Sequence, residues 1–439
     1  MTHASTVANR RLILSESKRL RFFTLFIFYL NQGVGWGLFS LLLPIWLTAN
    51  GATIGQVATV ASITALPWSL KFINGFLIDR YTFLPMGRRR IWVVGAQIVV
   101  LAIMIIVALL SPQPNEIFLL ASLGFGMNLA INFQDVGVDA LAIDVMEDSE
   151  RATGTGIMFG SQVIGIAITV GLGGWLINSF GLSLAIISLT SVPAFTLLYG
   201  LVIIERAGEK NLPWGQGKTH PFNREREIKA WRPLLKETLS ATFGPVSLLV
   251  IPLLFIRSIG AGAINVFGPT LFTTHGGWST TSYSNLVSLG AVVTGIWGML
   301  LGGKIVKGLG EKNVIAFCLG SLCVLYACFA ALPMLWTEKW FLVSFAIAVE
   351  LIGITAMIAV IPICMRLCVP AVVASQFVIY MSIANLGAPA GALLASVTAG
   401  QGHEQLLFWV LSLFMALFCL WSICAKALYS LNDPKNITA

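Results

Sequence analysis

Apolar runs long enough to cross a lipid bilayer recur along the whole chain, separated by charged or Gly/Pro-rich breaks. A helix needs about 20 mostly apolar residues to span the hydrocarbon core. Only 10% of the 439 residues are charged, which is too few for a water-soluble domain of this length. The pattern therefore predicts an all-α polytopic membrane protein whose main partner is the lipid bilayer.

The apolar windows predict twelve spans in two groups of six. They cover residues 22–47, 56–78, 91–111, 117–143, 153–177, 182–204, 246–273, 281–303, 314–334, 340–365, 372–398 and 406–428. The polar segment between the groups predicts a linker. We therefore expect an N-terminal bundle over residues 1–204, a cytoplasmic linker over 205–244 and a C-terminal bundle over 245–439.

The lysines and arginines predict the orientation of these spans. Nearly all of the 27 fall in alternate loops, with Lys339 on the other side and Lys71 and Arg257 inside spans. Cytoplasmic loops carry the excess of positive charge, so both termini and the linker are predicted to be cytoplasmic. The net charge of +8 then reflects membrane orientation and not nucleic-acid binding.

An internal repeat relates the two groups of spans. When the first span is laid over the seventh, the matching pairs are Gly35 with Gly260, Gly37 with Gly262, Pro44 with Pro269 and Gly51 with Gly276. Duplicated halves related by an axis along the membrane normal are one of the transporter architectures. We expect two pseudo-symmetric six-helix bundles.

Five ionisable residues lie inside the predicted spans: Lys71, Asp135, Asp139, Arg257 and Glu350. An ionisable group at membrane depth costs about 2.5 kcal/mol or more, so each is a functional candidate. Asp135 and Asp139 share one helical face of the fourth span with Asn128 and Asn132. Lys71 is the natural counter-ion of these carboxylates. Two interpretations stay open: a permanent pair that locks the N-terminal half, or a proton-coupling pair that protonation or substrate breaks.

Arg257 aligns with Gln32 across the repeat, near the middle of the seventh span. A buried guanidinium is suited to bidentate capture of a carboxylate or phosphate, so we expect Arg257 to bind an anionic group of the substrate; pairing with Glu350 is the alternative. Gln32, Trp36 and Asn265 lie in glycine-containing stretches of the first and seventh spans. These stretches either open to a cavity or serve close helix packing. The expected substrate-binding set comprises these three residues together with Asn128, Asn132, Arg257 and Glu350.

The end of the second span and the turn after it carry Gly75, Leu77, Asp79, Arg80, Gly87, Arg88 and Arg89. This motif resembles the cytoplasmic signature of the major facilitator superfamily. The G-R-R-R run at 87–90 comes later after Arg80 than in the usual signature. This spacing and the Q-D-V-G-V-D-A run at 134–140 are similar to those of the peptide–acetyl-coenzyme A transporter family. That family includes muropeptide permeases, acetyl-coenzyme A transporters and, in related branches, siderophore importers. The resemblance covers roughly residues 62–175. Muropeptide permeases carry an aromatic and a basic residue where this chain has Leu141, Ala142 and Ile143.

The resemblance implies a secondary active transporter, not an enzyme, with no cofactor. We expect proton-coupled import of a moderately large anionic or peptide-like solute, such as a siderophore, muropeptide or coenzyme A-type metabolite, by a monomer in a bacterial inner membrane. Asp79, Arg80, Arg88 and Asp144 lie at the cytoplasmic boundary and are expected to form a salt-bridged gate. The alternatives are an exporter or antiporter of the same fold, or a membrane receptor that does not transport.

Overall fold

The computed structural model of the chain describes residues 12–429, apart from the side chains at positions 54, 58, 255–257, 280, 281 and 427. Within that part, ten helical stretches are long and apolar enough to cross a membrane. They are Lys18–Ala49, Arg90–Leu110, Ile117–Val145, Asp148–Val202, Pro245–His275, Ser282–Leu309, Glu311–Ala331, Lys339–Leu367, Val373–Gln401 and Glu404–Cys424. The prediction of a polytopic helical membrane protein is confirmed. Both chain termini lie outside the described residues, so their predicted side of the membrane stays a prediction.

The helices before the linker, called here the N-terminal helices, are α1 (Lys18–Gly37), α2 (Leu43–Ala49), α3 (Ile54–Ser69), α4 (Lys71–Arg80), α5 (Arg90–Leu110), α6 (Ile117–Val145), α7 (Arg151–Ile168), α8 (Gly174–Leu189) and α9 (Ser191–Val202). The linker, residues 205–244, contains α10 (Pro221–Arg224) and α11 (Trp231–Thr242). The C-terminal helices are α12 (Pro245–Thr270), α13 (Thr280–Trp297), α14 (Gly303–Leu309), α15 (Glu311–Ala331), α16 (Lys339–Leu367), α17 (Val373–Val397) and α18 (Glu404–Cys424).

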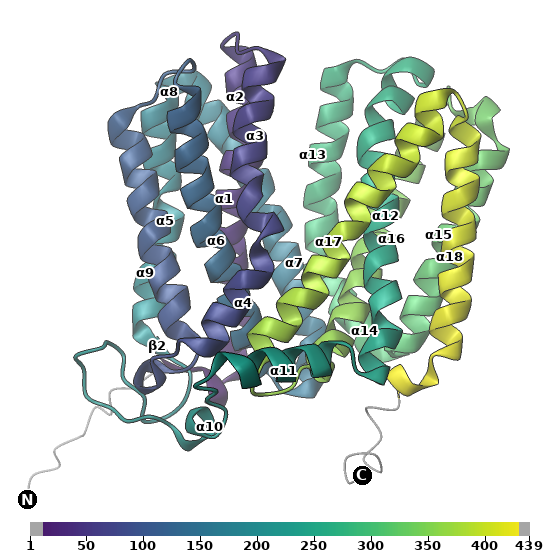
Figure 1. Cartoon of the computed structure of the whole chain (residues 1–439). Coiled ribbons are helices and arrows are strands. Elements are labelled where there is room, and N and C mark those ends of the chain that lie inside the picture. Colours follow the sequence, from purple (N-terminus) through teal and green to yellow (C-terminus); the bar gives the residue numbers. More distant parts are fainter. Residues whose placement is uncertain (1–11, 430–439) are drawn as a thin grey trace, which may run out of the picture.

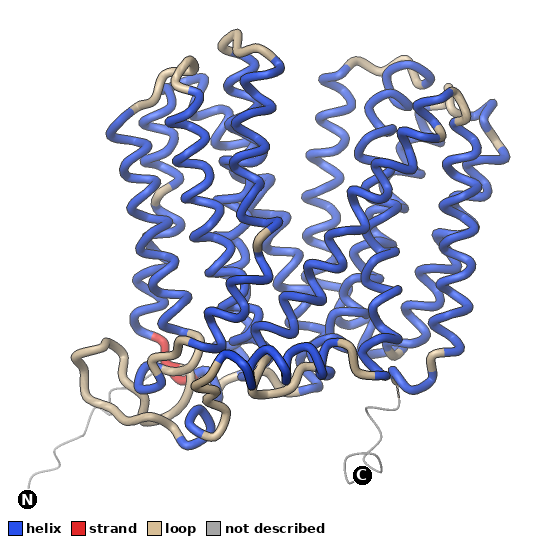
Figure 2. The backbone as a smooth tube through the Cα atoms, viewed as in Figure 1, coloured by secondary structure: helices blue, strands red, loops and turns tan. Residues whose placement is uncertain are grey.

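Figure 1 shows the N-terminal helices, from purple to blue, beside the C-terminal helices, from green to yellow, with the linker along one end of both. We call this end the linker face. Figure 2 shows how little of the described chain lies outside helices. One small element that periodicity did not predict is a parallel pair of two-residue strands, β1 (Leu12–Ile13) and β2 (Ile203–Ile204). It ties the start of the described chain to the start of the linker.

The two sets of helices pack closely near the linker face, where glycines allow backbones to meet. Helix α4 contacts α17, and α7 contacts α13 and α14. A Cβ atom added at Gly160 of α7 would lie 2.5 Å from the carbonyl oxygen of Gly295 in α13. The opposite end of α13 is different, because most of its described residues from 282 to 289 are exposed, namely 282, 284, 285 and 287–289. Successive helical residues point about 100° apart, so this end of α13 is uncovered on more than one side.

We predict that Gly75→Ala will open the linker face. A Cβ at Gly75 of α4 would lie 2.5 Å from a methyl of Val378 and 2.7 Å from the carbonyl oxygen of Ala374, both in α17. Overpacking of this kind costs about 1–3 kcal/mol, which favours the open arrangement by roughly fivefold or more. Spin labels at positions 83 and 309, one on each set of helices, will report a longer distance.

The matched control is Gly290→Ala, because a Cβ at that position meets nothing within 4 Å. It should leave the distance between the labels unchanged. Equal distance distributions for Gly75→Ala and the parent chain would show that this helix contact does not hold the linker face closed.

Candidate functional site

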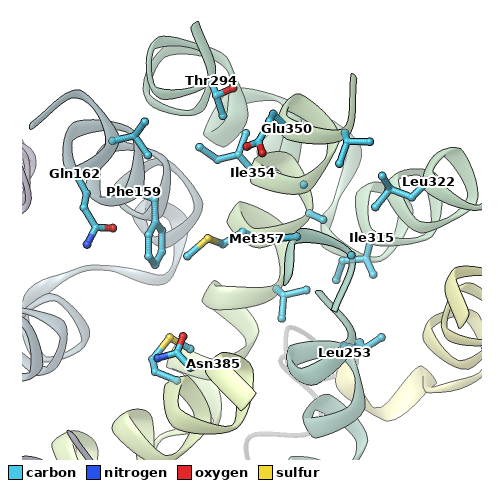
Figure 3. Close-up of a pocket in the computed structure, with 18 of the residues that line it drawn as sticks. Phe159, Gln162, Leu253, Thr294, Ile315, Leu322, Glu350, Ile354, Met357 and Asn385 are labelled. Carbon is cyan, nitrogen blue, oxygen red and sulfur yellow. The ribbon is translucent and has the colours of Figure 1, made fainter. Parts of the chain in front are cut away.

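A cavity of about 400 Å³ lies between the N-terminal and C-terminal helices. Its polar lining residues are Tyr29, Gln32, Trp68, Lys71, Asp135, Asp139 and Gln162 from the N-terminal helices and Thr294, Tyr326, Glu350 and Asn385 from the C-terminal helices. The remaining lining is mostly aliphatic and includes Leu253, Ile315 and Leu322. Figure 3 shows Gln162 and Phe159 on one side of the hollow, facing Glu350 and the aliphatic side chains on the other. The cavity therefore has one polar wall and one mainly apolar wall.

The polar wall holds a buried cluster of one lysine and two aspartates. The ammonium group of Lys71 forms an ion pair with the carboxylate of Asp135, which also accepts a hydrogen bond from Gln32 Nε2 at 2.5 Å. The hydroxyl of Tyr29 donates to Asp139. Lys71 is 5% exposed and each aspartate 4%. One cation thus stands beside two carboxyl groups in a place with little access to water.

Lys71 occupies this position because the helix that carries it is broken. Helix α3 ends at Ser69, Leu70 leaves the helical conformation with φ −95° and ψ 7°, and α4 begins at Lys71. Pro67 contributes to the break, since proline has no N–H to donate within a helix. A break inside a helical segment at membrane depth, as we predict for α3 and α4, exposes backbone carbonyls, which need donors from neighbouring helices.

Asn128 and Asn132 of α6 supply those donors. The amide of Asn128 donates to the carbonyl of Thr64 at 2.9 Å, and that of Asn132 donates to the carbonyl of Pro67 at 2.8 Å. Both asparagines are fully buried, and neither lines the cavity. The structure therefore places these two residues against the α3 backbone, not against a substrate. Helical periodicity correctly placed them on one face of α6 with Asp135 and Asp139. It could not show that the asparagines contact the α3 backbone while the aspartates line the cavity.

The apolar wall carries a single acidic side chain, Glu350 of α16. Its side chain is exposed to the hollow, and it forms no ion pair with the described side chains. Arg257 belongs to α12, but its side chain is among those left undescribed, so its pairing with Glu350 or with a substrate stays a prediction. Trp36 is partly buried and Asn265 is exposed; neither of them lines the cavity.

Six polar cavity residues were missed by the sequence reasoning: Tyr29, Trp68, Gln162, Thr294, Tyr326 and Asn385. Tyr29 lies one turn before Gln32 on α1, so its position on the same helical face is a signal that could have found it. Two buried polar atoms of this wall have no hydrogen-bond partner: Oε1 of Gln32 and Nε1 of Trp68. Both atoms are buried within the wall, so neither is open to a solute in this conformation.

A second charged cluster crosses between the two sets of helices at the linker face. Asp79 at the end of α4 accepts hydrogen bonds from Arg89 Nη1 at 2.6 Å and from both the backbone N–H and the hydroxyl of Ser375 in α17, each at 2.8 Å. Arg88 lies 3.4 Å from Asp79 and donates to the carbonyls of Pro370 and Ala371. Burial lowers the pKa of Arg88 to about 10, so it remains a cation at neutral pH.

Asp144 joins this cluster through Arg89, whose Nε lies 2.9 Å from its carboxylate. The expectation differs from the structure at Arg80, which forms no ion pair with the described residues. Its guanidinium lies 5.1 Å from the ring of its neighbour Tyr81. Consecutive helical residues point in different directions, so when Asp79 faces the C-terminal helices, Arg80 faces away from them. Arg89 holds the place in the cluster that we expected Arg80 to take.

Comparison with known proteins shows the family to which the chain belongs. Residues 22–375 match the family model of the Major Facilitator Superfamily. The chain belongs to this superfamily. It is 28% identical over 149 residues to the anhydromuropeptide permease of Escherichia coli K12, a match that covers 34% of this chain and 30% of that permease. The chain thus spans about a third of the length of this curated relative.

A longer and weaker match covers most of the chain. The folate-biopterin transporter of Synechocystis is 23% identical over 391 residues, which is 86% of this chain and 74% of that protein. Among solved structures, the superfamily transporter FucP of E. coli in its outward conformation superposes with a TM-score of 0.67 at 13% identity, covering 92% of this chain and 98% of that chain. The family model and these likenesses indicate a transporter family with the major facilitator fold and not an enzyme family.

Proposed function

We propose that the chain is a proton-coupled secondary transporter that imports a moderately large anionic or peptide-like solute by alternating access. In this proposal twelve spans form two six-helix bundles, 1–204 and 245–439, joined by a cytoplasmic linker over 205–244, in a monomer of a bacterial inner membrane. The observation that carries the proposal is the buried Lys71–Asp135–Asp139 cluster on the wall of a cavity between the two sets of helices.

The conformation supports alternating access. The linker carries many lysines and arginines, and such loops face the cytoplasm, so the linker face is the cytoplasmic face. The helices meet there through Asp79 and Ser375, while the far end of α13 is uncovered. In this proposal the chain therefore adopts an outward-facing state.

The charge balance supports proton coupling. Two buried carboxylates beside one ammonium leave an uncompensated negative charge if both are ionised, which is unfavourable at low dielectric. Asp139 is hydrogen-bonded to the neutral Tyr29, whereas Asp135 pairs with Lys71, so Asp139 is the better proton carrier. An anionic group of the solute that approaches Lys71 would compete with Asp135 and favour its protonation in turn. The permanent structural pair is the alternative interpretation.

The cavity supports an amphipathic solute. Its size lies within the range of sites for small organic molecules, roughly 300–1,000 Å³, and it opposes polar groups to an aliphatic wall. Relatives are named as an anhydromuropeptide permease and a folate-biopterin transporter. These two classes, together with siderophores and coenzyme A-type metabolites, are the solutes to test first.

The test is uptake into proteoliposomes that contain the purified chain, with labelled anhydromuropeptide, pterin, siderophore and coenzyme A-type solutes offered in turn. We expect one class to accumulate against its gradient when the lumen is alkaline and to stop accumulating when an ionophore collapses the pH gradient. Accumulation driven by outward proton movement would favour an antiporter. Saturable binding of a solute without any transport would favour a receptor.

We predict that Arg257→Lys will weaken uptake of an anionic solute by roughly tenfold or more, because lysine keeps the charge but loses the two parallel donors of the guanidinium. The measurement is the concentration that gives half-maximal uptake. Arg232→Lys, a change at an exposed position of α11, is the control. An unchanged apparent affinity in Arg257→Lys would assign the arginine to Glu350 or to packing.

A further inference from the structure

A second hollow, of about 810 Å³, lies on the N-terminal helices away from the central cavity. Its long part is apolar and is lined by α5 and α6, with Trp92, Gly95, Val99, Ile103, Gly126 and Phe133 among the contributors. Its other end is polar and includes Arg80, Tyr81, Thr82 and Glu227. We call this feature the α5–α6 groove. It shares no lining residue with the central cavity.

The apolar part of the groove is open to the hydrocarbon region. Val99 and Ile98 of α5, a membrane-spanning helix, are 47% and 53% exposed. A Cβ at Gly95 would meet nothing within 4 Å, so the glycine leaves space and does not serve close packing. The rings of Trp92 and Phe133 stack 5.4 Å apart near the polar end. From Trp92 to Ile103 the groove follows α5 for roughly 16 Å, a length suited to an alkyl chain.

The polar end carries a cation without a protein partner. Nε of Arg80 is buried and has no hydrogen bond, and the guanidinium forms no ion pair with the described residues. Glu227 lines the same end, but its carboxylate lies 3.5 Å from the ammonium group of Lys229. The ion pair of Glu227 is thus with Lys229 and not with Arg80, which remains available. The planar fork of an arginine suits the oxygens of a phosphate.

Helix α11 indicates that this end lies at the depth of lipid headgroups. The ring of Trp231 at the start of α11 contacts Tyr81 edge-on, with ring centroids 5.9 Å apart. Trp231, Leu235 and Leu239 are exposed along one side of α11, and the exposed Arg232 and Lys236 lie beside them. A helix with an apolar row flanked by cations is typical of the membrane interface.

We propose that the α5–α6 groove binds one anionic phospholipid, with an acyl chain along Gly95 and Gly126 and the phosphate on Arg80. This explains why Arg80 faces away from the Asp79 cluster and why an open glycine lies on an otherwise bulky apolar helix. The site is independent of the solute path, so it stands or falls separately from the proposed transport activity.

The experiment measures lipid retention on the full-length chain by native mass spectrometry, from micelles that contain phosphatidylglycerol or phosphatidylcholine. The parent chain should retain one phosphatidylglycerol roughly fivefold or more in preference to phosphatidylcholine. Arg80→Gln should remove that preference. Gly95→Leu, whose Cβ would meet nothing within 4 Å, places a side chain in the groove and should lower retention of both lipids.

Two controls separate this site from general surface effects. Gly171→Leu changes another exposed glycine whose Cβ would meet nothing within 4 Å and which lies outside the groove. Arg232→Gln removes an exposed cation of α11. Both should behave as the parent chain, and thermal unfolding should be similar in all four variants. Equal retention of the two lipids by the parent chain, or equal loss in Gly95→Leu and Gly171→Leu, would overturn the proposal.

Discussion

Lys71→Met is expected to abolish solute accumulation and to destabilise the chain strongly. The substitution leaves the carboxylate of Asp135 without its cation at a site that is 4% exposed. Removing one partner of a buried ion pair costs about 3–5 kcal/mol. Thermal unfolding in detergent will measure the loss of stability. Uptake into proteoliposomes should fall by roughly a hundredfold or more, because the ammonium group for which Asp135 and the anionic solute compete is then absent.

The double variant Lys71→Met/Asp135→Asn distinguishes the two interpretations of this pair. It removes both charges, and replacing a whole buried pair by neutral groups is often neutral or stabilising. We expect most of the lost stability to return while uptake remains absent. Uptake at the parent rate in the double variant would show that the pair serves only as a structural lock.

A matched control is available at another buried pair. Arg21 and Glu150 lie 2.7 Å apart and are 4% and 2% exposed, but neither lines the central cavity. Arg21→Met should destabilise the chain, and Arg21→Met/Glu150→Gln should recover much of that stability. Unlike the variants at Lys71, this double variant should retain uptake.

Asp79→Asn is expected to open the linker face. The Asp79 carboxylate accepts from Arg89 and from two donors of Ser375 in α17, and hydrogen bonds to a charged group contribute about 1.5–3 kcal/mol each. Losing the charge should therefore shift the ratio of open to closed forms by roughly tenfold or more. The closed form is the one that these contacts stabilise.

Cys368 is a suitable reporter of that opening. It is 8% exposed and directly precedes the segment whose carbonyls accept from Arg88. Burial raises the pKa of its thiol well above the ordinary value, so alkylation is slow while the face is closed. In a chain that retains Cys368 as its single cysteine, Asp79→Asn should accelerate alkylation by a maleimide roughly tenfold.

The matched control for this prediction is Asp144→Asn. Asp144 pairs with Arg89, but it accepts no hydrogen bond from α17 among the described residues. It therefore supports the cluster without crossing to the C-terminal helices, and its effect on alkylation should be small. If the two variants accelerated alkylation equally, the contact between Asp79 and Ser375 would not be what keeps the face closed.

The outcome at Arg80 and Arg89 illustrates a limit of motif reasoning. The sequence places both arginines near Asp79 along the chain, and proximity favoured Arg80, the immediate neighbour. The partner is decided by direction in space, because Arg80 points about 100° away from Asp79 around α4. Arg89 reaches Asp79 only because the loop after α4 folds back beneath it.

The sequence by itself determined that this chain is a polytopic helical membrane protein, because repeated apolar runs of this length are stable in a lipid bilayer and not in water. It also indicated Lys71, Asp135 and Asp139 as candidate site residues, because an ionised group in hydrocarbon is costly to retain. Only the tertiary structure decided their partners: Tyr29 for Asp139, Gln32 for Asp135, and the broken α3 backbone for Asn128 and Asn132. Periodicity assigns a residue to a face of its own helix. Its partner depends on how neighbouring helices are rotated and how closely they approach, and this packing is determined jointly by residues far apart in the chain.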